Sequence, residues 1–342
     1  MRVVIAPDKF AGTLTATEAA EAIAAGWRSV APDNELATIP LSDGGPGLLD
    51  VVEHALGGAR VPVVTRDPLG RPIPADVLVT DDAVHVESAR AIGLHLVAPE
   101  ERDPERATSA GLADLLREAL RRPGRRILVG LGGSATTDGG RGLIESLGDD
   151  EVAALRQREL VALCDVDNPL LGPNGAAAVF GPQKGADASA VQRLDRRLSE
   201  WAAQIGLPVD RPGAGAAGGL GAALFWLGAT AAPGARTLAE VAGFPAALEG
   251  ADLALTGEGA YDFTSLRGKV VAGVARAAAA EAVPCLVLAG RVTVGRREML
   301  SSGVDAAFAL VDEPGGERRA LADPAGALVD LAARVARQWA RP

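Results

Sequence analysis

The chain has 342 residues, a formal net charge of −10 and 23% charged residues. This acidic balance argues against binding to a nucleic-acid backbone, which requires a basic surface, and the length allows two domains of ordinary size. Only three of the 34 basic residues are lysines: Lys9, Lys184 and Lys269. Arginine replaces a compact, mobile ammonium poorly, so the surroundings of these three lysines are the first candidate sites.

The chain begins with a short apolar run, residues 3–6, which predicts a buried strand and not a signal peptide. No apolar stretch approaches the ~18 residues of a membrane helix. Cys164 and Cys285 lie far apart in strand-like runs, without metal-ligand spacing. We expect a cytoplasmic protein, a monomer or homodimer, without a nucleic-acid or membrane partner.

The first 60 residues predict a β-α-β unit. Strands at 3–6 and 35–41 flank a helix whose start fits a capping box, Thr15-Ala-Thr-Glu18. From residue 61 the first strands are short and alternating, which predicts antiparallel pairing. The strands expected in this region are 61–65, 75–79, 84–87, 127–131 and 160–164, with helices at 109–121 and 188–205.

The alternation of strands and helices returns after residue 236. The expected strands are 251–256, 283–289 and 306–311, and the expected helices are 270–282 and 328–339. Together with the N-terminal segment they supply five parallel strands, enough for a flavodoxin-like sheet. We therefore predict an α/β fold in which a flavodoxin-like parallel-sheet domain, residues 1–60 and 240–342, is interrupted by a second α/β domain with a mixed sheet, residues 61–239.

A glycine-rich loop follows the strand that ends near residue 129. Residues 130–140 read Gly-Leu-Gly-Gly-Ser-Ala-Thr-Thr-Asp-Gly-Gly. Glycines let backbone N–H groups approach an anion, and the hydroxyl groups add donors. This composition favours a phosphate or anion loop over a simple tight turn.

Residues 213–219 form a second glycine-rich segment that precedes a helix. The N–H groups at the start of that helix favour an anion, but close helix packing explains the small residues equally well. Both glycine segments match G-x-G-x-x-G or its alanine variant, which leaves a nicotinamide-dependent oxidoreductase as a weaker alternative.

All three lysines lie in loops marked by glycine and acids. Lys184 is the next-to-last residue of the segment 164–185, and Lys269 is the last residue of the segment 256–269. A carboxylate pair can hold Mg²⁺ at a nucleotide phosphate, and a lysine can neutralise the transferred group. Lys9 follows Asp8 at the end of the first strand, and Asp43 follows the second strand. Neighbouring strand ends would bring the two acids together. Turns and helix caps, however, also use aspartate at such positions.

These segments, in this order, resemble the bacterial two-domain (type 1) glycerate kinases. The resemblance spans essentially the whole chain and is strongest at 132–140, 164–175, 180–186, 213–220, 256–259 and 268–269. It implies a flavodoxin-like domain with an inserted α/β domain and an active site in the interdomain cleft. It also implies ATP- and Mg²⁺-dependent phosphorylation of D-glycerate to 2- or 3-phosphoglycerate.

The resemblance and the loops together give a set of candidate residues. The catalytic candidates are Asp43, Asp138, Lys184 and Lys269, with Asp43 or Asp138 as the base. The metal candidates are Asp165, Glu258 and Asp262. The candidates for binding substrate and phosphate are Asp8, Lys9, Gly132, Gly133, Ser134, Thr136, Asn168, Gly218, Gly219 and Ser265.

Several positions depart from the family pattern, among them Ala110, which stands where an aromatic residue is common. Ala11 and Ala260 stand where a lysine and an arginine are common, and Pro46 and Leu48 stand in place of Glu and Thr. These changes remove a carboxylate and up to two positive charges. Two alternatives therefore stay open: phosphorylation of another small hydroxy acid, and a non-catalytic regulatory protein that binds a nucleotide or a small acid.

Overall fold

The structure is a computed structural model that describes residues 1–266 and 270–340. The chain divides into two compact units. Unit 1 comprises Met1–Asp43, Asp50–Leu56 and Ala235–Pro342, and unit 2 comprises Gly44–Leu49 and Gly57–Gly234. The chain therefore leaves and re-enters unit 1 twice, and the short segment Gly44–Leu49 belongs to unit 2.

Unit 1 contains a five-stranded sheet in the order β11-β10-β9-β1-β2, with every pair parallel. The strands are β1 (Arg2–Ile5), β2 (Glu35–Thr38), β9 (Leu253–Tyr261), β10 (Cys285–Val292) and β11 (Ala306–Ala309). Read along the chain this is the order 2-1-3-4-5, which is that of flavodoxin. The predicted flavodoxin-like sheet is confirmed.

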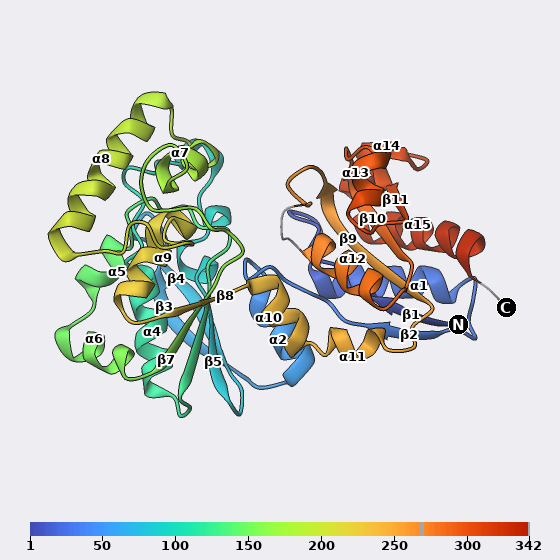
Figure 1. Cartoon of the computed structure of the whole chain (residues 1–342), viewed down its shortest axis with the longest axis horizontal. Coiled ribbons are helices and arrows are strands. Elements are labelled where there is room, and N and C mark those ends of the chain that lie inside the picture. Colours follow the sequence, from blue (N-terminus) through green and yellow to red (C-terminus); the bar gives the residue numbers. More distant parts are fainter. Residues whose placement is uncertain (267–269, 341–342) are drawn as a thin grey trace. The chain divides into compact units, whose positions relative to one another are not determined.

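Helices cover both faces of this sheet. One core cluster packs α1 (Ala16–Arg28) and α15 (Pro324–Trp339) against the sheet, and the two helices lie side by side (Figure 1). A Cβ at Gly26 of α1 would collide with the Val329 carbonyl oxygen, so glycine permits this close approach. The other face packs on α12 (Val270–Ala280). The remaining helices with residues in unit 1 are α2 (Leu48–Leu56), α10 (Gly234–Val241), α11 (Phe244–Leu248), α13 (Arg296–Ser301) and α14 (Gly316–Ala322).

The predicted capping box at the start of α1 is present. The Thr15 hydroxyl accepts from the Glu18 N–H at 3.1 Å, and the Glu18 carboxylate accepts from the Thr15 N–H at 2.8 Å. Two N–H groups that the helix cannot satisfy are bonded in this way. The first crossover helix therefore starts where the sequence predicts.

Unit 2 contains a six-stranded sheet in the order β3-β4-β5-β6-β7-β8. Its strands are β3 (Ala59–Arg66), β4 (Pro72–Val79), β5 (Ala83–Glu87), β6 (Arg126–Gly130), β7 (Glu159–Leu163) and β8 (Thr230–Ala232). β3, β4 and β5 pair antiparallel, whereas β5 to β8 pair parallel. The predicted mixed sheet is confirmed.

The helices of unit 2 are α3 (Ala89–Ile92), α4 (Gly111–Arg121), α5 (Arg141–Ser146), α6 (Asp149–Arg156), α7 (Ala176–Phe180), α8 (Ala188–Ile205) and α9 (Ala216–Trp226). The sequence did not predict α3, α5, α6 or α7. The expected plain loop before Gly185 contains α7 and a 3₁₀ turn at Pro182–Lys184, and α5 and α6 precede β7. These helices are too short for apolar periodicity to be visible. Among the described residues, no helix has the length and apolar character needed to span a bilayer.

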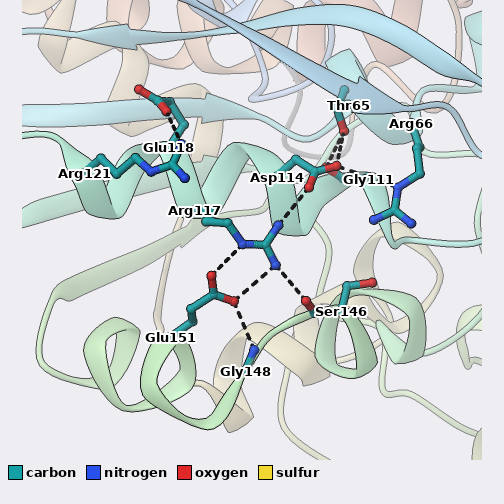
Figure 2. A network of polar contacts seen from close by, with 10 residues as sticks. All are labelled: Thr65, Arg66, Gly111, Asp114, Arg117, Glu118, Arg121, Ser146, Gly148 and Glu151. Atoms are coloured by element: carbon teal, nitrogen blue, oxygen red, sulfur yellow. Dashed lines mark hydrogen bonds and ion pairs between the residues drawn. The ribbon is translucent and has the colours of Figure 1, made fainter.

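An arginine network ties α4 to the two helices that follow β6 (Figure 2). Arg117 on α4 donates to both carboxylate oxygens of Glu151 on α6, at 2.5 and 3.1 Å. It also donates to the Ser146 carbonyl oxygen at 2.7 Å and to Asp114 at 2.8 Å. One guanidinium thus connects three helices through four hydrogen bonds, two of them a bidentate pair.

We expect Arg117→Met to lower the free energy of unfolding by about 1–2 kcal/mol, because four charge-assisted bonds are lost from a side chain that is only 28% exposed. The matched control is Arg236→Met. Arg236 forms one pair, with Glu240, and is 79% exposed, so a change within about 0.5 kcal/mol is expected. Urea unfolding of both variants measures the difference. Equal effects would contradict the stabilising role of the network.

Candidate active site

In unit 2, the 3₁₀ turn that follows α7 brings a buried lysine onto the glycine-rich loop. Lys184 is 2% exposed, and its Nζ donates to the Ser134 hydroxyl at 3.1 Å and to the Thr136 carbonyl oxygen at 2.6 Å. Burial lowers the pKa of Lys184 to about 7, although the nearby charge of Asp138 opposes that shift. The structure therefore brings together two segments, 130–140 and 164–185, that are distant in the sequence.

The two hydroxyl groups beside Ser134 are also buried. Thr136 and Thr137 are at most 2% exposed, and within the described residues neither Oγ1 atom has a hydrogen-bond partner. A buried hydroxyl without a partner costs free energy, and sites that bind ligands often retain such groups. These two hydroxyls are therefore candidate donors to an anion.

The segment 213–219 packs directly on the same loop. A Cβ at Gly218 would collide with the Thr136 carbonyl oxygen, and one at Gly219 would lie 2.8 Å from the Gly139 Cα. The Gly139 N–H donates to the Gly218 carbonyl oxygen at 3.0 Å. Close packing, one of the two explanations offered by the sequence, accounts for both glycines. Anion binding by Gly218 and Gly219 stays a prediction.

Backbone strain marks this contact. Residues 217–219 interrupt the start of α9 with positive φ angles, and Ala217 has φ 52° and ψ 38°. A left-handed conformation costs a residue with a Cβ roughly 1–2 kcal/mol, whereas glycine adopts it freely. Non-glycine strain of this kind is concentrated at functional sites.

We expect Ala217→Gly to raise the free energy of unfolding by about 0.5–1 kcal/mol, since relief of the left-handed strain exceeds the entropic cost of glycine. Ala222→Gly, within the regular part of α9, is the matched control and should lower it by about 1 kcal/mol. Chemical denaturation gives both values. Destabilisation by both substitutions would show that Ala217 is not strained.

Asp138 is held by four donors. Its Oδ2 accepts from the N–H and the hydroxyl of Ser109, both at 2.8 Å, and from the Gly142 N–H at 3.0 Å; its Oδ1 accepts from the Gly140 N–H at 3.1 Å. The Ser109 hydroxyl in turn accepts from the Leu143 N–H at 3.0 Å. These contacts fix the end of the glycine-rich loop to the start of α5. Ser109 was not among the predicted site residues, because the sequence places it only as the first residue of an expected helix.

Glu87, at the end of β5, was also missed. It is 2% exposed, and its Oε2 accepts from the N–H groups of Gly47 and Leu49 at 3.1 and 3.3 Å. These bonds hold the segment 44–49, which carries the family departures Pro46 and Leu48. The segment reaches the glycine-rich loop, where the Gly132 N–H donates to the Gly44 carbonyl oxygen at 3.4 Å. The sequence signal that could have identified Glu87 is an acidic residue at the end of an apolar strand.

Asp165 and Asn168 follow β7 in unit 2. The Asn168 side-chain amide donates to the Asn174 carbonyl oxygen at 2.8 Å, which closes the loop on itself. Asp165 is half-buried and carries electrostatic or hydrogen-bonding interactions of its own. The hydrogen bonds described for the Lys184 ammonium go to Ser134 and Thr136, and not to Asp165 or Asn168.

In unit 1, the ends of β1 and β2 bring Asp8, Lys9 and Asp43 together. The Lys9 Nζ lies 3.5 Å from Asp8 Oδ1 and 3.4 Å from Asp43 Oδ1. Burial raises the pKa of Asp8 to about 6; the Lys9 charge opposes this shift and the Asp43 charge adds to it. The two acids raise the pKa of Lys9 despite its burial. The expected convergence of Asp8 and Asp43 is therefore present in the structure.

The segment 256–269 differs from the expected loop. β9 continues to Tyr261, so Glu258 lies within a strand, paired with Ala289, and is 7% exposed. The loop starts at Asp262, whose Oδ1 accepts from the Thr264 N–H at 2.7 Å, while its N–H donates to the Ser265 hydroxyl at 3.2 Å. The predicted catalytic residue Lys269 lies outside the described residues.

The three predicted metal ligands are divided between the two units. Glu258 and Asp262 belong to unit 1, whereas Asp165 belongs to unit 2. Residues 1–266 and 270–340 contain no group of three or more His, Cys, Asp or Glu side chains arranged to hold a metal ion. Mg²⁺ in kinase sites takes only one or two carboxylates together with substrate phosphates, so the buried Glu258 still fits the donor chemistry.

The structure combines a doubly wound parallel sheet, a glycine-rich loop that holds a buried lysine, and a lysine–carboxylate cluster, which are the features expected of an α/β phosphotransferase. The chain belongs to the glycerate kinase family, whose model matches residues 3–154 and 149–340. It is thus a kinase whose phosphate acceptor is an alcohol group.

Individual relatives agree with this assignment. A glycerate kinase of Bacillus subtilis is 38% identical over 91% of this chain and 90% of its own length. A glycerate 2-kinase of Escherichia coli is 36% identical, with 92% of each chain covered. The crystal structure of a putative glycerate kinase 2 from Salmonella typhimurium LT2 superposes with a TM-score of 0.79 at 35% identity, covering 99% of this chain and 98% of that one.

Proposed function

We propose that this chain catalyses the Mg²⁺-dependent transfer of a phosphoryl group from ATP to D-glycerate and forms 2- or 3-phosphoglycerate. The observation that carries the proposal is the buried Lys184 ammonium bonded to a loop with two further buried hydroxyl donors, in a chain of the glycerate kinase family. Relatives named glycerate kinase and glycerate 2-kinase support the acceptor and leave both products open.

Unit 2 would bind phosphate groups. The Gly133 N–H and the hydroxyls of Ser134 and Thr136 are the proposed donors, with the Lys184 charge behind them. Gly132, whose N–H donates to the Gly44 carbonyl oxygen, would shape the loop for phosphate binding. Asn168, Gly218 and Gly219 would complete the surrounding loops. Preorganised donors of this kind stabilise the charge of a transferring phosphoryl group, because they need no rearrangement during the reaction. Asp138, which is held by four donors, would position the loop.

Unit 1 would supply the base. Asp43 is the proposed acceptor of the hydroxyl proton, since the Asp138 carboxylate is already committed to the loop. Lys9 would hold Asp43 and Asp8 in place, and Ser265 would order the loop after β9. Bound Mg²⁺ would neutralise phosphate charge, and the proposed ligands are Glu258, Asp262 and Asp165. We further propose that both predicted domains, residues 1–60 with 240–342 and residues 61–239, contribute to this reaction.

A coupled assay of ADP release with D-glycerate and ATP tests the proposal. Turnover that requires Mg²⁺ and yields a phosphoglycerate, identified by ³¹P NMR, is the expected result. A panel of other small hydroxy acids tests the alternative acceptor, which the departures Ala11, Pro46, Leu48 and Ala260 motivate. A folded protein that binds ATP by calorimetry but transfers phosphate to none of these acids would instead be the non-catalytic relative.

A further inference from the structure

Unit 1 contains a pocket whose lining includes none of the residues proposed above for catalysis, metal binding or phosphate binding. Its volume is about 250 Å³, and its apolar lining includes Phe10, Ala11, Ala260, Leu310, Val311 and Leu321. Leu321, on α14, leaves 66% of its surface exposed beside the pocket. Because pockets for drug-sized ligands measure roughly 300–1,000 Å³, this one suits a single ring system rather than a whole nucleotide.

The pocket lies at the end of the sheet where ligands bind in doubly wound folds. Thr13 and its neighbours come from the loop after β1, and Ala260 lies in the last residues of β9. Arg291 lies in the last residues of β10, and Val311 follows β11. Four strands therefore contribute their carboxyl ends, the edge at which an open α/β sheet binds its ligand.

The described lining has no net charge. Its two charged residues, Arg291 and Glu317, pair with each other at 2.7 Å. The Thr13 hydroxyl is bonded to the Phe10 carbonyl oxygen at 2.9 Å. An anion placed here would find no cation without breaking the ion pair, and burial of an unpaired charge is costly. A neutral, largely apolar group meets no such penalty.

Two glycines, Gly259 and Gly290, give this pocket a floor of bare backbone. They lie on the neighbouring strands β9 and β10, and a Cβ at Gly290 would collide with the Gly259 carbonyl oxygen. Glycine is therefore required for the approach of these strands. These two glycines add no side chains to a lining that also includes the apolar residues Leu310, Val311 and Leu321, so the pocket suits a neutral, flat group.

From this geometry we propose that the pocket binds the purine ring of the nucleotide that donates the phosphate. This inference rests on the proposed function, because that reaction brings three groups to the enzyme: phosphates, a small carboxylate and a purine. Only the purine is neutral, planar and largely apolar. The side chains of Ala11 and Ala260, both exposed and small, leave the space that the ring needs.

Calorimetric titration with ATP and with inorganic tripolyphosphate separates the purine from the phosphates. The wild-type protein should bind ATP at least roughly tenfold more tightly than tripolyphosphate. Ala260→Phe fills the pocket and should remove that preference without weakening tripolyphosphate binding. Ala11→Phe fills it from the loop after β1 and should do the same, which covers failure of either variant to fold. Ala59→Phe, another exposed strand alanine, in unit 2, is the matched control and should keep the preference.

Steady-state kinetics give a second readout. Ala260→Phe should raise KM for ATP roughly tenfold and leave KM for glycerate within about twofold. Retention of the ATP preference in both pocket variants, or its absence in the wild-type protein, would overturn the purine assignment. A rise in KM for glycerate alone would assign the pocket to the acceptor instead. Calorimetry measures binding without turnover. A protein that does not phosphorylate glycerate would therefore overturn the proposed function, but the comparison of ATP with tripolyphosphate could still be made.

Discussion

Lys184→Met should lower kcat/KM by about 10²- to 10³-fold. The substitution removes a buried ammonium that donates to the Ser134 hydroxyl and the Thr136 carbonyl oxygen, and loss of one preorganised donor has an effect of this size in other enzymes. The coupled ADP-release assay measures the loss. A thermal melt within a few degrees of the wild-type protein would show that the fold survives, and activity within about threefold of wild type would contradict the assignment.

The pH dependence distinguishes the charge of Lys184 from a purely structural role. Because burial lowers its pKa to about 7, wild-type kcat/KM should fall as pH rises through about 7. The folded state also binds fewer protons than the unfolded chain between pH 7 and 10.5, so the contribution of Lys184 to stability should rise across that interval. Activity and stability should therefore change in opposite directions, and Lys184→Met should lack both trends.

Asp43→Asn should lower kcat by about 10²- to 10⁴-fold, the usual contribution of a general base. The amide keeps an oxygen that can accept from the Lys9 ammonium, now 3.4 Å from Asp43 Oδ1, but it cannot accept a proton from a hydroxyl. KM for ATP should change little. Steady-state kinetics at saturating substrate measure the effect.

A second readout tests whether Asp43 acts through its charge on Asp8. The Asp43 charge contributes to the raised pKa of Asp8, about 6, so removal of that charge should lower the pKa of Asp8. A carboxyl NMR titration follows this shift. Asp33→Asn, an exposed aspartate of the same unit, is the matched control and should leave both kcat and the Asp8 titration unchanged. An unchanged kcat in Asp43→Asn would transfer the role of base to another residue.

The architecture was predictable because its strands are apolar runs with clear turns between them. The parallel sheet of unit 1 and the mixed sheet of unit 2 both follow from that pattern. β8 was not predictable, since it is three residues long and mostly exposed. The extension of β9 was misjudged because glycine suggested a loop. A Cβ at Gly257 would collide with the Leu288 carbonyl oxygen, so that glycine serves close pairing within the sheet.

The candidate site was predictable where sequence neighbours and strand order determine it. Asp8 and Asp43 converge because parallel strands end at the same edge. The contacts of Lys184 with Ser134 and of Ser109 with Asp138 span 50 and 29 residues, and no local pattern specifies them. Partners of this kind depend on tertiary packing, which composition and spacing do not determine.

The division of the chain affects how the protein folds while the ribosome synthesises it. Unit 2 is almost continuous, Gly57–Gly234, and its strands can pair as soon as that stretch has emerged. β1 must wait for β9, because Val3 pairs with Leu253. Until then the newly made N-terminal strands present an unpaired edge, open to wrong partners. The parallel sheet of unit 1 therefore closes late, after most of the chain has been made.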